Sequence, residues 1–110
     1  MITPVSTTTA IQVKDTLSYP NPCNPVSGLT IVYKLTRDAS EITFKLYTTS
    51  ARLIRKHTVS SLTSAGIKTI LISPGVLENL SQGVYFYVIE AKADNGTTAR
   101  SKIEEIIIIK

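Results

Sequence analysis

Apolar and polar residues alternate with a period of two along much of the chain. The alternation is clearest in residues 29–35 and 83–92. Because successive side chains of a strand point to opposite faces, this pattern predicts strands with one face in a core. The same pattern predicts strands at residues 11–17, 42–47, 53–59, 67–72 and 98–109, of which 53–59 is the weakest.

Turn-forming residues separate these segments. The Asn95-Gly96 pair lies between two predicted strands, and it predicts a type I′ hairpin turn because both residues tolerate positive φ. Pro74-Gly75 ends another strand, and residues 76–80 are expected to form one helical turn or a loop. No segment shows a convincing amphipathic helical period.

A proline-rich segment, Tyr19-Pro20-Asn21-Pro22-Cys23-Asn24-Pro25, follows the first predicted strand. Each proline fixes φ and removes a backbone donor. We therefore expect a rigid, extended corner rather than a central strand or a helix.

Seven strands at short intervals predict an all-β fold, an immunoglobulin-like antiparallel β-sandwich; a small barrel is the alternative. A β-branched composition of 14 Ile, 8 Val and 15 Thr among 110 residues agrees with this class. Residues 11–110 are expected to form one domain. Residues 1–10 show no period and are expected to form a flexible linker or terminal tail.

The charge of +4 comes from 12 basic and 8 acidic residues that are scattered along the chain. The tightest basic cluster is Arg52, Arg55, Lys56 and His57, which fits either a phosphate or acidic headgroup, or a solvated, protected strand edge. Aromatic residues do not interleave with a basic stripe, so we expect no nucleic-acid partner. The longest apolar run, 106–109, is far below the roughly 20 residues of a membrane span.

No group of residues in the sequence has the spacing of a catalytic site. His57 has no nucleophile or carboxylate beside it, and one His with one Cys cannot form a structural zinc site. Glu104 and Glu105 are adjacent on a predicted strand, so their carboxylates point to opposite faces. The sequence therefore predicts no catalytic residue, no metal and no cofactor.

Four consecutive isoleucines, 106–109, project to both faces of the last predicted strand. Either the sandwich covers both faces, or the strand presents an apolar edge to a partner, which would allow self-association by strand addition.

The order of these motifs resembles one bacterial family. The proline-rich segment is followed by Ala65-Gly66-Ile67, then by Gly83-Val84-Tyr85-Phe86-Tyr87, and a last strand ends at Lys110. This order resembles the immunoglobulin-like C-terminal domains of secreted and surface proteins, including type IX secretion sorting domains. The Ig-like domain of the flagellar hook-capping protein is similar. The resemblance covers residues 17–110.

The sequence departs from the family pattern at three places. Cys23 stands where Phe is usual, which implies a smaller anchor under the corner. Ala51 stands where a turn glycine is usual, which puts the tightness of that turn in question. No Trp occurs near residues 67–72.

The resemblance implies a non-catalytic C-terminal module of a larger extracellular or cell-surface protein, acting as a secretion signal. Its partners would be the secretion machinery or a neighbouring domain. The alternatives are an assembly module like the hook-capping domain and an accessory binding domain of a secreted enzyme. The family motif residues have a structural or a recognition role: Tyr19, Pro20, Asn21, Pro22, Asn24, Pro25, Gly66, Gly83, Tyr85, Tyr87 and Lys110. Tyr85 is expected either to form a tyrosine corner or simply to fill the core.

Overall fold

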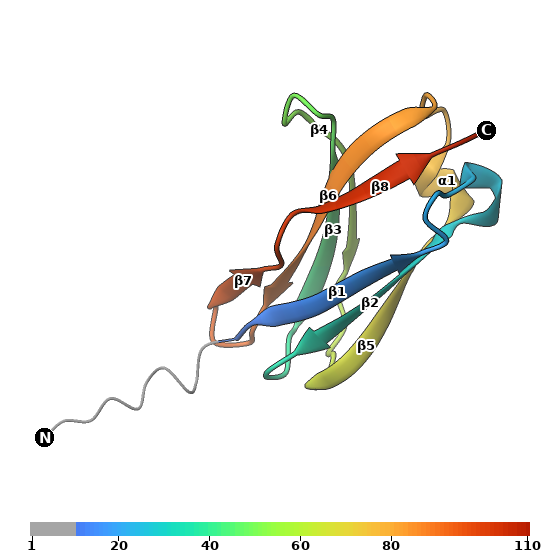
Figure 1. The fold of residues 1–110 in the computed structure, drawn as a ribbon. Coiled ribbons are helices and arrows are strands. Elements are labelled where there is room, and N and C mark those ends of the chain that lie inside the picture. Colours follow the sequence, from blue (N-terminus) through green and yellow to red (C-terminus); the bar gives the residue numbers. More distant parts are fainter. Residues whose placement is uncertain (1–10) are drawn as a thin grey trace, which may run out of the picture.

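The computed structural model describes residues 11–110 and contains eight strands and two single helical turns (Figure 1). The strands are β1 (Val13–Tyr19), β2 (Leu29–Leu35), β3 (Glu41–Tyr47), β4 (Leu53–Val59), β5 (Gly66–Ile72), β6 (Gly83–Lys92), β7 (Thr98–Arg100) and β8 (Glu104–Ile108). The 3₁₀ turn η2 spans Pro25–Ser27 and the helical turn α1 spans Pro74–Leu77. The predicted linker, residues 1–10, lies outside the described residues.

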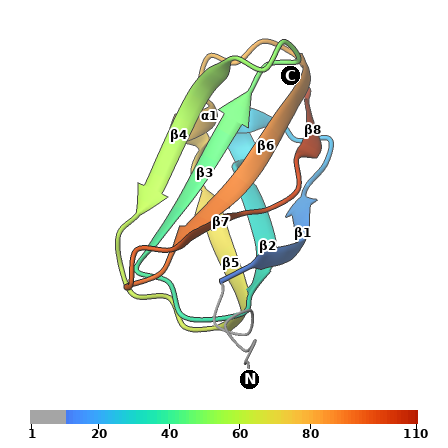
Figure 2. The same cartoon turned by 90° about the vertical axis from the view of Figure 1, so that its left-hand side faces the viewer.

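The strands form two separate antiparallel sheets. Sheet A has the order β1-β2-β5, and sheet B has the order β4-β3-β6, with β7 and β8 both pairing with β6. In Figure 2 the strands of sheet B lie in front of those of sheet A. The predicted β-sandwich is therefore confirmed, and the alternative of a barrel is not what forms.

The core fills the space between the two sheets. The predicted inward faces of β2, β3 and β6 are confirmed, since their alternate side chains are all buried. The inward residues of these three strands are Leu29, Ile31, Tyr33, Leu35, Ile42, Phe44, Leu46, Tyr85, Tyr87, Ile89 and Ala91. They belong to one hydrophobic cluster, which gives the sandwich a single core.

The prediction of one strand over residues 98–109 is wrong, because the segment forms β7 and β8. The partner of Glu90 is Arg100 but the partner of Tyr87 is Glu104, so one extra residue lies between the two ladders. Buried Ser101 bridges the break. Its hydroxyl accepts the Ile89 N–H at 2.9 Å, and its own N–H donates to the Ile89 carbonyl at 2.8 Å.

The first predicted strand is displaced and contains a β-bulge. Lys14 pairs with Lys34 but Leu17 pairs with Val32, so Asp15 and Thr16 together oppose one residue, and Asp15 has a φ of 52°. The bulge moves later side chains to the other face. Leu17, predicted to be buried, is 62% exposed, and Ser18 takes the inward position instead.

The turn at Asn95-Gly96 is not the predicted type I′ turn. Gly96 has a φ of 90°, but Asn95 is not among the described residues with positive φ, whereas type I′ requires two such residues. The Ala93 carbonyl accepts the Gly96 N–H at 3.0 Å, as in a type I turn followed by a left-handed residue.

Two helical turns also differ from expectation. The helical turn predicted at residues 76–80 lies closer to the N-terminus, at α1. Pro74 begins it with a helical φ, and its missing N–H costs no hydrogen bond because the first N–H groups of a helix have no partner within the helix. The proline-rich corner is extended only as far as Asn24, because η2 begins at Pro25.

Candidate functional site

The proline-rich corner lies beside β8 and continues sheet B at its edge. Cys23 forms a parallel bridge with Ile108. Its N–H donates to the Ile107 carbonyl at 2.7 Å, and its carbonyl accepts the Ile109 N–H at 2.9 Å. β8 is therefore held between β6 on one side and the corner on the other (Figure 1).

Asn21 adds two hydrogen bonds from its side chain. The amide Nδ2 donates to the Glu105 carbonyl at 3.1 Å, and Oδ1 accepts the Ile107 N–H at 3.1 Å. The side chain thus substitutes for one residue of a neighbouring strand, offering a donor and an acceptor to the β8 backbone. Pro20 and Pro22, both preceded by cis peptide bonds, flank it and have no N–H to offer.

We call the contact between residues 21–23 and β8 the clasp. It satisfies backbone groups along the outer edge of β8 that would otherwise be open to another strand. Self-association through this strand stays a prediction, and the clasp occupies part of the edge it would use.

Cys23 is the anchor beneath the corner. Its side chain is fully buried, and the thiol donates to the Gly28 carbonyl with an Sγ–O distance of 3.3 Å. Burial raises the pKa of this thiol, which keeps it protonated and unreactive. The smaller residue therefore still fills a core position under the prolines.

Asn24 and Pro25 begin the 3₁₀ turn η2. The Asn24 Oδ1 accepts the Val26 N–H at 3.1 Å as an N-cap, and Pro25 occupies the first helical positions. After η2, Gly28 has a φ of 72°, and a Cβ there would lie 2.8 Å from the Ile72 carbonyl oxygen. The chain can approach β5 this closely only with glycine.

Tyr85 and Tyr87 point from β6 into the core near β8. The Tyr85 hydroxyl donates to the Ser81 carbonyl at 2.6 Å, which confirms the upstream backbone bond of a tyrosine corner. Burial raises the pKa of Tyr87, whose hydroxyl is hydrogen-bonded by Ser18. The centroid of the Tyr87 ring lies 5.8 Å from the centroid of the Phe44 ring.

The remaining motif residues are divided between the two ends of the sandwich. Gly83 pairs with Ile108, and the Lys110 N–H donates to Gln82 Oε1 at 3.2 Å, so both lie beside the clasp. Gly66 pairs with Leu35 at one end of sheet A. The corner lies at the other end of this sheet, beside the Leu29–Ile72 pair. The structure therefore gathers every motif residue except Gly66 at or near the β8 end. Ser18 carried no sequence signal, because its partner is set by tertiary structure. Gln82 belongs to the segment of residues 80–87 that carries the family resemblance, but its bond to Lys110 could not be predicted from the sequence.

The four isoleucines 106–109 are neither covered on both faces by the sandwich nor all presented at an open edge. Ile106 and Ile108 are fully buried between the sheets, and Ile107 is half-buried on the other face. Ile109 is 42% exposed beyond the strand.

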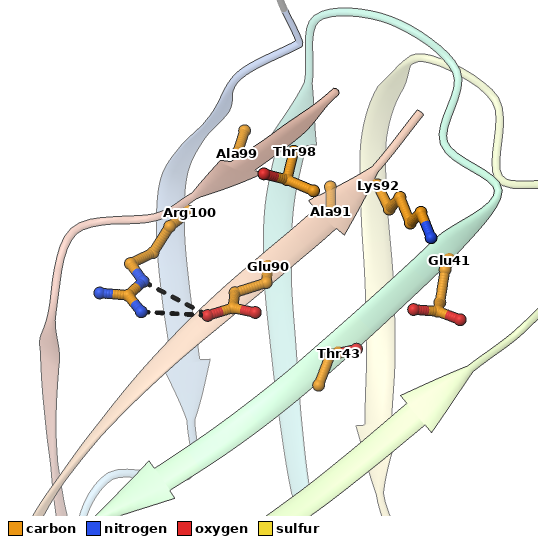
Figure 3. A pocket seen from close by; sticks show the side chains of 8 residues that line it. All are labelled: Glu41, Thr43, Glu90, Ala91, Lys92, Thr98, Ala99 and Arg100. Carbon is orange, nitrogen blue, oxygen red and sulfur yellow. Dashed lines mark hydrogen bonds and ion pairs between the residues drawn. The ribbon is translucent and has the colours of Figure 1, made fainter. Parts of the chain in front are cut away.

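Charged side chains meet in a hollow on the outer face of sheet B (Figure 3). The Glu90 carboxylate lies 3.0 Å from Lys45 Nζ and 3.2 Å from an Arg100 nitrogen. Burial alone would raise the pKa of Glu90, but hydrogen bonds and positive charge from Lys45 and Arg100 outweigh it and lower the pKa. The carboxylate stays ionised and links β3, β6 and β7, which is a structural role.

Three further hollows lie elsewhere on the described surface. One, on sheet B, is lined by apolar side chains including Phe86, Val88 and Ile103. A second lies between η2 and α1, and a third lies between the β1 bulge and Lys102. Across residues 11–110, no three His, Cys, Asp or Glu side chains gather as metal ligands.

The basic cluster of β4 is partly structural. The Arg55 guanidinium donates to the Val76 and Glu78 carbonyls at 3.0 and 2.8 Å, which ties β4 to α1. His57 is half-buried on the same edge strand. This arrangement agrees with a protected strand edge. In the described part of the chain, no helix is long and apolar enough to cross a membrane.

The fold and the clasp define an immunoglobulin-like β-sandwich module whose distinctive feature is a held C-terminal strand. The profile of the family described as the secretion system C-terminal sorting domain matches residues 17–108. The chain therefore belongs to this family, the type IX sorting domains, and the resemblance seen in the motifs is confirmed. Such domains are non-catalytic sorting signals of proteins exported to the cell surface or the extracellular space.

Among solved structures, the chain is similar to dimeric latent PorU from Porphyromonas gingivalis, with a TM-score of 0.69 and 19% sequence identity. The similarity covers 90% of this chain but only 9% of the PorU chain. At this identity it supports the fold. A comparison with curated protein sequences finds no significant match.

Proposed function

We propose that this domain is the C-terminal module of a longer exported protein, and that the secretion machinery recognises it as a folded unit at the clasp. The module itself performs no chemistry. The observation that carries the proposal is the convergence of the family motif residues on β8, where Asn21 and Cys23 hold the strand. A recognition surface built from distant segments exists only after folding, so it would report a completed domain.

Exposure supports this assignment. Tyr19, Asn21, Asn24 and Lys110 are exposed around the buried anchor Cys23, so polar and aromatic groups face outward at the corner. The backbone bonds of the clasp fix their positions, which limits the entropy lost on binding.

The test fuses residues 11–110 to a periplasm-directed reporter in a host with type IX secretion. We expect the reporter to reach the surface or the medium. A reporter that stays in the periplasm, on a domain shown to be folded, would contradict the sorting role.

A pair of variants tests the clasp itself. Asn21→Ala removes both side-chain bonds to β8 and is expected to lower export several-fold. Asn95→Ala, the matched control, removes two turn bonds from Thr97 at another part of the sandwich and is expected to leave export unchanged. Equal export of both variants, each folded at the assay temperature, would assign recognition to another surface.

A further inference from the structure

The outer face of sheet A combines exposed apolar side chains with lysines. The register places three cross-strand rows on this face: Lys14, Lys34 and Ile67; Leu17, Val32 and Thr69; and Tyr19, Thr30 and Leu71. We call these nine residues the outer face of sheet A. It belongs to a different layer from sheet B, which carries the charged hollow (Figure 2).

Four side chains of this face are large, apolar and exposed. Leu17, Tyr19, Ile67 and Leu71 are exposed by 62, 50, 75 and 69%. The β1 bulge contributes to this surface, because it turns Leu17 and Tyr19 outward and Ser18 inward. Large exposed apolar side chains that gather on one face mark an interaction site more often than scattered apolar residues do.

The nine positions of this face carry two lysines, and Asp15, Lys102 and Glu104 border it in the hollow that Lys14 also lines. Lys14 and Lys34 are direct cross-strand partners and both are exposed, and none of the nine positions is acidic. Like charges directly opposite each other are unfavourable unless an anion lies nearby. The ion pairs of Glu90, on the other sheet, are made with Lys45 and Arg100 and do not involve these lysines. The face therefore complements a surface that is both apolar and anionic.

The shape of this face distinguishes between the possible partners. None of the four exposed apolar side chains lines any of the four hollows described above. Protein partners usually anchor side chains in pockets, whereas a lipid surface accepts aliphatic side chains without one. Tyrosine suits the headgroup level, and lysine stems lie along apolar surface while their ammonium groups reach lipid phosphates.

We propose that the outer face of sheet A is a peripheral binding surface for anionic lipid bilayers. Leu17, Ile67 and Leu71 enter the interface, Tyr19 lies at headgroup level, and Lys14 and Lys34 contact lipid phosphates. This proposal does not depend on the sorting role.

The test is co-sedimentation of residues 1–110 with vesicles of phosphatidylcholine alone or with about one part in four of phosphatidylglycerol. The wild type is expected to partition about tenfold more strongly onto the anionic vesicles, since each basic residue near such a surface adds attraction. Absence of binding to anionic vesicles would overturn the proposal.

Two double variants with matched controls locate the surface. Lys14→Gln/Lys34→Gln is expected to lose most of the anionic preference. Lys56→Gln/Lys92→Gln makes the same charge change at exposed positions of sheet B and is expected to keep the preference. Ile67→Ser/Leu71→Ser is expected to weaken binding about tenfold. Its control is Leu62→Ser/Ile103→Ser, which replaces residues that are 75 and 66% exposed and should bind like the wild type.

Equal losses in the variants and their controls would mean unspecific attraction and would overturn the assignment. Light scattering measures whether the chain forms a dimer in solution. A dimer that Ile67→Ser/Leu71→Ser dissociates would assign this face to a second copy of the chain and also overturn the proposal. Circular dichroism checks that all four variants fold; they change exposed positions only.

Discussion

Two turns of sheet B place different residues in the same backbone position. In each turn the fourth residue adopts positive φ: Ala51 at 67° and Gly96 at 90°. In each, its N–H donates three residues back, to Thr48 at 2.9 Å and to Ala93 at 3.0 Å. The turn missing its usual glycine therefore keeps its geometry, and Ala51 bears the steric cost of the left-handed region.

This equivalence predicts opposite effects of exchanging the two residues. Ala51→Gly should raise the free energy of unfolding by up to about 1 kcal/mol, and Gly96→Ala should lower it by a similar amount. A Cβ at Gly96 meets no atom within 4 Å, so the change isolates backbone strain. Urea denaturation measures both; the same sign for the two variants would refute the equivalence.

Tyr85 is the second residue with a testable local role. Tyr85→Phe removes the hydroxyl bond to the Ser81 carbonyl and should cost about 1 kcal/mol of stability. Tyr19→Phe, at a half-exposed tyrosine, is the control and should be neutral. Equal midpoints in thermal denaturation would show that Tyr85 acts through packing alone.

At the scale of elements, strand positions followed from the alternation of side chains, but three features did not. The β1 bulge exposes Leu17 because Asp15 takes a conformation that no local pattern announced. The break between β7 and β8 depends on Ser101 bonding to Ile89, twelve residues away. The clasp likewise depends on partners more than eighty residues apart. Local patterns predict strands, whereas tertiary hydrogen bonds decide where ladders shift.

The clasp gives an element-scale prediction. Asn21→Ala should lower the free energy of unfolding by about 1–2 kcal/mol, because two backbone groups of β8 lose their partner. Amide hydrogen exchange of Ile107 should accelerate more than that of residues in β3. Asn24→Ala, which removes only the cap of η2, serves as the control and should leave Ile107 exchange unchanged. Unchanged Ile107 exchange in Asn21→Ala would show that the clasp does not hold the strand.

At the scale of the whole molecule, the fold class could be predicted from periodicity, composition and turn residues. The alternating apolar positions of both sheets meet in one core, which is the arrangement that this periodicity indicates. The site could be predicted only as a set of motif residues. Their gathering at one end, with Gly66 apart, required the sheet order. Neither the clasp nor the lysine-bearing face of sheet A could be predicted, because the first needs side-chain geometry and the second needs the displaced register of β1.

We expect the fold to lose stability in acid through Glu90. Its folded pKa lies below its ordinary value of 4.5, so its ion pairs stabilise the fold above that value, and this contribution is lost as pH falls through the folded pKa. Glu90→Gln should reduce stability at pH 7 by about 0.5–1 kcal/mol and should flatten the loss of stability below pH 4.5. Thermal midpoints between pH 7 and 3 measure this; parallel curves for both proteins would exclude Glu90 as the source.

The clasp also sets an order of events during synthesis. Asn21 and Cys23 leave the ribosome early, but their partners at residues 105–109 come more than eighty residues later. While residues 24–104 are being added the corner has no strand to hold, and a chain that stops before residue 105 never gains one. A completed sandwich therefore indicates that the residues of β8 have been translated.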